Sequence, residues 1–179
     1  AVDEGWLNES AKVVSIIVIG GVLIGIAHRL RLKYRAFSSV LAGGGIAALY
    51  IAIAIGFQLY GLFSQSAAFA ILVVITILAI MLSLAYDKME LAVIAIFGGF
   101  ATPLLVSTGA GNYKVLFTYI LILDLGMLVL AYFKKWNLVN FVANFATVVL
   151  YMAWIIDIIF DEKVLPHPGA LVFATAFYL

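Results

Sequence analysis

The chain has 179 residues, of which 66% are hydrophobic and 11% are charged, and its formal net charge is +1. A soluble domain is nearer half apolar and a quarter charged, so this composition excludes an ordinary water-soluble fold. The small net charge points to no nucleic acid partner, and the absence of cysteine excludes disulfides and thiolate chemistry.

Apolar segments of about 20 residues follow one another along the chain. A helix rises about 1.5 Å per residue, so about 20 residues cross the hydrocarbon of a bilayer. No charge occurs between Arg35 and Asp87, and glycine, serine and glutamine in 60–66 predict a turn inside that stretch. The sequence predicts an all-α polytopic transmembrane helical bundle, a single region over 1–179, with spans at 11–27, 40–59, 67–86, 91–106, 115–133, 138–160 and, incomplete, 169–179.

Both ends of the sequence suggest a longer protein. The chain opens on Ala1 rather than methionine, and it stops at Leu179 inside an apolar run. We therefore expect an internal fragment, with the remaining spans of the same longer chain as its partners.

Basic residues predict the orientation of the spans. They are concentrated in the turns after the first, third and fifth spans: Arg29, Arg31, Lys33, Arg35, Lys88, Lys134 and Lys135. The positive-inside rule then places the N-terminus of this chain outside the cytoplasm. The cluster from Arg29 to Arg35 suits anionic lipid headgroups better than nucleic acid.

Small residues recur at helical spacing in the first three spans. In lipid, helices associate through close backbone approach, which small residues allow. We expect helix–helix contacts at three sets: Gly21 and Gly25; Gly44, Ala48, Ala52 and Gly56; Thr76, Ala79 and Ser83.

Asp124 lies at the midpoint of the predicted fifth span. A carboxylate at that depth costs several kcal/mol unless it is protonated, paired or hydrated. Intramembrane acids are candidates for ion or proton sites, and the alternative is a hydrogen-bonded structural acid facing a neighbouring helix.

Polar residues form a stripe along the predicted sixth span. Their spacing of three and four residues places them on one helical face: Asn140, Asn144, Thr147, Tyr151 and Trp154, with Asp157 nearby. The stripe could line an aqueous path, but hydrogen bonding between helices is the interpretation we favour.

The predicted fourth span is short and contains Pro103, preceded by Gly98, Gly99 and Thr102. Proline cannot donate to the carbonyl of the preceding turn, so the helix should kink or end there. Broken helices form the binding sites of many transporters, although a kinked helix ending in a loop is the plainer interpretation. The two histidines, His28 and His167, make no metal signature, and no residue set predicts a cofactor or a catalytic centre.

Several stretches resemble one bacterial family of polytopic membrane proteins, the family of domain of unknown function 2339. The resemblance spans about 37–154 and rests on LAGGG with Tyr50, GGFATPLL with STG, LFTY, and KKW. It implies bacterial origin, an inner-membrane location, and longer relatives with many more spans and often a soluble N-terminal region. It implies no catalytic residues.

Three hypotheses follow for function. The leading one is a non-enzymatic scaffold or assembly component of the bacterial envelope. The second is a transporter or channel whose site lies between the fourth, fifth and sixth spans, with Asp124, Thr102 and Asn144. The third is a membrane enzyme using Asp157, Asp161 and Glu162 as acids.

Overall fold

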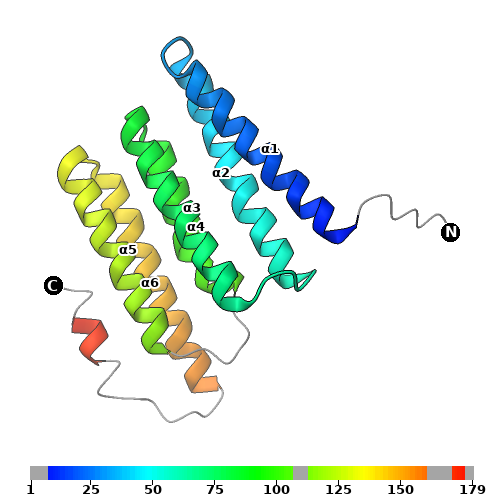
Figure 1. The fold of residues 1–179 in the computed structure, drawn as a ribbon. Coiled ribbons are helices and arrows are strands. Elements are labelled where there is room, and N and C mark those ends of the chain that lie inside the picture. Colours follow the sequence, from blue (N-terminus) through cyan, green and yellow to red (C-terminus); the bar gives the residue numbers. More distant parts are fainter. Residues whose placement is uncertain (1–7, 107–112, 161–170, 176–179) are drawn as a thin grey trace. The chain divides into compact units, whose positions relative to one another are not determined.

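The computed structural model describes residues 8–106, 113–160 and 171–175, without the side chains of 113–115 and 157–160. It divides into two compact units, one up to Ser107 and one from Thr108, which are described separately. Long helices make up both units, and the described residues contain no strand (Figure 1). The expected all-α membrane fold is confirmed.

The helices of the first unit are α1 (Glu9–Leu30), α2 (Arg35–Gln58), α3 (Gln65–Tyr86) and α4 (Met89–Leu105), and those of the second are α5 (Tyr113–Lys134) and α6 (Asn137–Phe160). A short helix at 171–175 also belongs to the second unit. All the long helices except α4 include an apolar stretch long enough to cross a membrane, and α4 is a shorter apolar helix.

Most of these helices extend a few residues beyond the apolar segments seen in the sequence. α2, for example, begins at Arg35, whereas its predicted span begins at Val40. Hydropathy marks the residues that lie in hydrocarbon, whereas the helical backbone continues into the headgroup layer.

Close backbone contact joins α1 to α2 at two glycines. A Cβ atom on Gly45 would lie 2.7 Å from the carbonyl oxygen of Gly20, and one on Gly20 would lie 2.9 Å from the carbonyl oxygen of Gly45. Since neither residue can carry a side chain without separating the helices, this pair sets the distance between α1 and α2. Figure 1 shows the two helices side by side.

The small-residue pattern predicted this interface only in part. Gly21, Gly25 and Gly44 are exposed, and a Cβ on any of them would meet nothing within 4 Å, so those expected contacts are wrong. Ala52 and Gly56 are buried as expected. Gly20 and Gly45 make the α1–α2 contact instead. Each helix has glycines on more than one face, and the spacing of the glycines does not show which face packs against the other helix.

The expected small-residue face of α3 is confirmed, since Thr76, Ala79 and Ser83 are all buried. Tyr50 from α2 reaches this face, and its hydroxyl lies 2.7 Å from Thr76 Oγ1. Thr76 Oγ1 also lies 2.9 Å from the carbonyl oxygen of Leu72, to which it donates, so Tyr50 is the donor to Thr76.

The ring of the same tyrosine lies against α4. A Cβ on Gly98 would be 2.2 Å from Cε2 and Cζ of Tyr50, so only glycine leaves room for the ring. Tyr50 thus joins three helices, α2, α3 and α4, through one hydroxyl and one ring face.

Among the described residues, the Tyr86 hydroxyl is a buried side-chain group without a hydrogen-bond partner.

Two glutamines bind the C-terminal end of α4. Gln58 Nε2 donates to the carbonyl oxygen of Leu105 at 2.8 Å, and Gln65 Nε2 donates to that of Val106 at 2.9 Å. The last carbonyls of a helix lack partners in their own helix, and these amides supply them. α4 continues through Pro103 and ends at Leu105.

Candidate functional site

The second unit contains the intramembrane acid, in a helical hairpin made by α5 and α6. α5 ends at Lys134, and the next residue, Lys135, has the left-handed conformation (φ 53°), with its N–H donating to the carbonyl oxygen of Ala131 at 2.7 Å. A residue in this conformation closes many helix ends, and here it allows α6 to begin two residues later.

Asp124 is half-buried on α5 and lies against Thr147 on α6. Thr147 Oγ1 is 2.8 Å from Oδ1 and 2.9 Å from Oδ2 of Asp124, and it is also 3.1 Å from the carbonyl oxygen of Ala143. A threonine hydroxyl has one proton and can also accept. With an ionised Asp124, Thr147 donates to the carboxylate; with a protonated Asp124, the carboxyl donates to Thr147 and Thr147 donates to Ala143. Both protonation states are therefore hydrogen-bonded inside the hairpin.

Aromatic packing continues the α5–α6 contact beyond this pair. The Phe117 side chain is fully buried, and its ring centroid lies 5.5 Å from that of Tyr151 and 4.8 Å from that of Trp154. Phe173 of the short helix contacts the same ring, at 5.0 Å. Edge-on and tilted aromatic pairs at these distances stabilise a contact by about 0.5–1.5 kcal/mol each beyond the area they bury.

The polar stripe of α6 has two parts, one that packs against α5 and one that is exposed. Thr147, Tyr151 and Trp154 face α5, whereas Asn140 and Asn144 are exposed. Neither asparagine has a side-chain hydrogen bond to another residue that the structure describes. Asn144 lies about 10 Å along α6 from its first residue, a depth at which lipid offers no hydrogen-bond partner.

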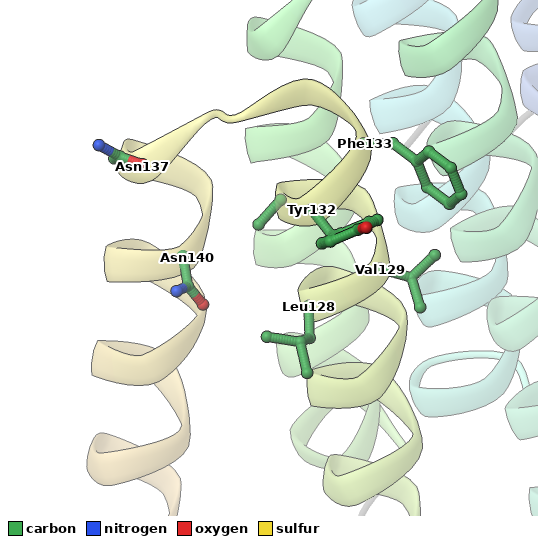
Figure 2. Close-up of a pocket in the computed structure, with 7 residues that line it drawn as sticks. Leu128, Val129, Tyr132, Phe133, Asn137 and Asn140 are labelled. Carbon is green, nitrogen blue, oxygen red and sulfur yellow. The ribbon is translucent and has the colours of Figure 1, made fainter.

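A groove of about 490 Å³ opens at the turn end of the hairpin. Its lining comes from both helices: Leu128, Val129, Ala131, Tyr132 and Phe133 on α5, and Asn137 and Asn140 on α6. In Figure 2, Leu128 extends from α5 toward α6, and Asn140 lies across from it. Apolar surface thus lies beside two amides in one open groove.

The other candidate residues lie in the first unit or outside what the structure describes. Thr102 is fully buried on α4, and its Oγ1 donates to the carbonyl oxygen of Gly98 at 2.9 Å, within its own helix. The Asp157 side chain, Asp161 and Glu162 lie outside the described residues. No group of three or more histidines, aspartates or glutamates that could hold a metal occurs among the residues described.

Sequence reasoning named Asp124 but not its partner. Thr147 belonged to the polar stripe, yet nothing there tied it to Asp124. The position of Thr147 relative to the turn could have predicted the contact. Asp124 and Thr147 lie at equal distances along the sequence from the turn at Lys135 and Trp136. In an antiparallel hairpin with so short a turn, such residues lie at the same depth.

Comparison with known proteins gives one match. The model of the family described as Predicted membrane protein (DUF2339) matches residues 1–179, the whole of this chain. No curated protein and no solved structure matches it. Long apolar helices in both units agree with the description that the family carries, and the chain belongs to this family of predicted membrane proteins.

Proposed function

We propose that this chain is a non-enzymatic integral-membrane component that serves as a scaffold for the assembly of other transmembrane helices. The observation that carries the proposal is the hydrogen bonding of Asp124 to Thr147 within one hairpin. Because the acid has its partner there in either protonation state, it acts as a structural link between α5 and α6, as polar pairs between membrane helices do.

The amide of Asn144, which is exposed on the outer surface of the hairpin, also supports the assembly function. An amide in hydrocarbon that lacks a partner costs several kcal/mol, so a neighbouring helix with a hydrogen-bonding group satisfies it. The occupant of this face is then a further transmembrane helix, from the same longer chain or from another subunit.

The setting proposed for this component is the bacterial inner membrane. Basic residues support an orientation with the turns after α1, α3 and α5 on the cytoplasmic side. In that arrangement the N-terminus of this chain lies outside the cytoplasm, and the α5–α6 turn with Lys134 and Lys135 faces inward.

The size of the complex in mild detergent tests the assembly function. We expect Asn144→Leu in the full-length protein to shift native-gel migration from a larger complex to a smaller species. Asn144→Gln, which keeps an amide, and Asp124→Asn, which keeps an acceptor for Thr147, should preserve the complex. Identical migration of the wild type and Asn144→Leu, both as isolated monomers, would contradict the proposal.

Ion or proton translocation is the second candidate, and one observation favours it. Asp124 is only half-buried at the middle of α5, while the exposed amides of Asn140 and Asn144 lie on α6 between the turn and Thr147. Together these groups could conduct a proton or a cation from the turn end of the hairpin to the midplane.

Labelling of engineered cysteines separates the two candidates, because the chain contains no cysteine. Single cysteines at Ile120, Leu128 and Asn144 would be treated with a small membrane-impermeant thiol reagent in intact and opened cells. Ile120 is fully buried and lies one turn beyond Asp124, so its labelling would show water at the midplane and favour translocation. Protection at Ile120, with Ser64 and Asn137 labelled as turn controls, supports the assembly component.

A further inference from the structure

We propose that the turn between α1 and α2 is a docking surface for anionic phospholipids, on which cationic side chains bind headgroup phosphates and apolar side chains enter the interfacial layer. This basic turn comprises residues 29–37 and lies at the end of the α1–α2 hairpin (Figure 1). The proposal is independent of the assembly function, which depends on the α5–α6 hairpin. It is also independent of the orientation of the chain, since it concerns only the lipid beside the turn.

The charge of the basic turn comes from four cationic side chains. They are Arg29, Arg31, Lys33 and Arg35. Three of them are exposed and Arg31 is half-buried, and none of the four forms an ion pair or a side-chain hydrogen bond with a residue that the structure describes. The sequence has no acidic residue between Glu9 and Asp87. Each basic residue near an anionic membrane surface strengthens binding about fivefold, so the four charges favour anionic lipid.

Exposed apolar side chains lie among these charges. Leu32 is 81% exposed, Tyr34 52% and Phe37 56%. Lys33 Nζ lies 5.6 Å from the ring centroid of Tyr34, so a cation and an aromatic ring lie together, as is typical of residues at the level of lipid headgroups. The turn directly joins two helices that are long and apolar enough to cross a membrane, which places it beside the headgroups. Lipid is therefore the partner that this mixture of charged and apolar side chains favours over an acidic protein.

Hydrogen bonds hold the backbone of the basic turn in place. The buried Ser38 Oγ donates to the carbonyl oxygen of Ala27 at 2.7 Å, which joins α2 to α1 next to the turn. The carbonyl oxygen of Leu30 accepts from the N–H groups of Lys33, at 3.0 Å, and Tyr34, at 2.8 Å. Because this backbone is already ordered, lipid binding loses little conformational entropy beyond that of the side chains.

Quenching of a fluorescent label by brominated lipids tests the basic turn, because the chain has no cysteine. A bimane-labelled cysteine would replace Ala36, an exposed residue of the turn, in the full-length protein in phosphatidylcholine vesicles. We expect half-maximal quenching by brominated phosphatidylglycerol at a mole fraction at least about fivefold below that for brominated phosphatidylcholine. The matched reporter replaces Ala67, an exposed residue in the first turn of α3 within the charge-free stretch, where the two lipids should quench equally. Equal quenching at Ala36 would overturn the proposal and favour an acidic protein partner.

A matched pair of lysine variants separates the basic turn from the overall charge of the chain. Lys33→Gln and Lys12→Gln each remove one exposed positive charge from the first unit, but Lys12 lies in the first turn of α1, at the other end of that helix. Lys33→Gln should reduce the preference for phosphatidylglycerol by up to about fivefold, and Lys12→Gln should leave it unchanged. Leu32→Gln keeps every charge and should weaken quenching by both lipids. Equal losses of preference in the two lysine variants, or unchanged quenching in Leu32→Gln, would contradict the proposal.

Discussion

The two units satisfy their polar groups in different ways. In the α1–α4 unit, the buried hydroxyls of Tyr50 and Thr76 bind each other and the Gln65 amide binds the carbonyl of Val106, although the buried Tyr86 hydroxyl has no hydrogen-bond partner among the residues described. In the α5–α6 unit, Asp124 and Thr147 bind each other, whereas the side-chain amides of Asn140 and Asn144 are exposed and have no hydrogen bond to the residues described.

The difference between the units separates internal packing from surfaces suited to association. A hydroxyl or amide in lipid that binds a neighbouring helix of its own unit needs nothing else. An amide that is exposed at the same depth is a group that a further molecule must cover. Apart from Tyr86, the first unit thus binds its polar groups internally, whereas the exposed amides of the second unit fit the assembly function proposed above.

The largest effect that distinguishes the units should come from the α1–α2 glycine contact. In Gly45→Ala the new methyl group would lie 2.7 Å from both the Gly20 carbonyl oxygen and Ile24 Cγ1, so the helices must separate. We expect a loss of about 1–3 kcal/mol in the free energy of unfolding, measured in mixed micelles with a denaturing detergent. Gly44→Ala is the matched control, because it meets nothing within 4 Å, and helix propensity makes it neutral or stabilising by up to about 1 kcal/mol. Equal losses in the two variants would refute the contact.

The Tyr50 junction should give the next largest effect. Gly98→Ala would force the Tyr50 ring aside and break its hydrogen bond to Thr76, with a loss of about 1–2 kcal/mol in the same unfolding assay. Because the obstacle is one side chain, a second change to Tyr50→Leu should recover part of the stability that Gly98→Ala loses. If the double variant is less stable than Gly98→Ala alone, the ring is not the obstacle.

A smaller effect is expected at Asp124 and Thr147. A double-mutant cycle with Asp124→Leu and Thr147→Val should give a coupling energy of about 0.6–1.7 kcal/mol, as measured for polar pairs between membrane helices. Asp124→Asn should lose less stability than Asp124→Leu, because its amide oxygen still accepts from Thr147. A coupling energy near zero would mean that the pair does not link the helices.

The smallest effect should follow removal of the two glutamine amides at the end of α4. Gln65→Ala and Gln58→Ala each remove one hydrogen bond to a terminal carbonyl, so each should reduce the stability by about 0.5–1.5 kcal/mol. The hydrogen bond of Gln58 is exposed and that of Gln65 is partly buried, so the change at Gln58 should give the lower value. Hydrogen exchange at the last turn of α4 would localise both effects. Unchanged exchange in both variants would exclude the amides as caps.

The sequence predicted the fold well, because length and hydropathy alone define helices in lipid. It predicted helix contacts less well: α1 and α2 pack through Gly20 and Gly45 rather than through Gly21, Gly25 and Gly44. Small residues occur on more than one face of these helices, and the face used depends on which neighbour lies there. That information is tertiary and is absent from the spacing of one helix.

The sequence predicted Asp124 as a candidate site residue, but it did not predict the contact between Asp124 and Thr147. Asp124 stands out because a carboxylate is rare at the middle of an apolar segment, whereas Thr147 is an ordinary residue whose importance comes from its depth opposite Asp124. The Tyr50 junction was likewise hidden, since it needs one residue from each of α2, α3 and α4. Such sets become visible only once the helices are placed beside one another.

The shortness of α4 has a consequence for bilayer thickness. Its 17 residues rise about 25 Å, which is less than the hydrocarbon thickness of about 30 Å, and two glutamine side chains replace water at its final carbonyls. A helix that ends below the lipid surface favours local thinning of the membrane around it, at a fraction of a kcal/mol for each ångström of mismatch. The first unit should therefore be most stable in thin bilayers, and changes in lipid chain length would act on it without any change in sequence.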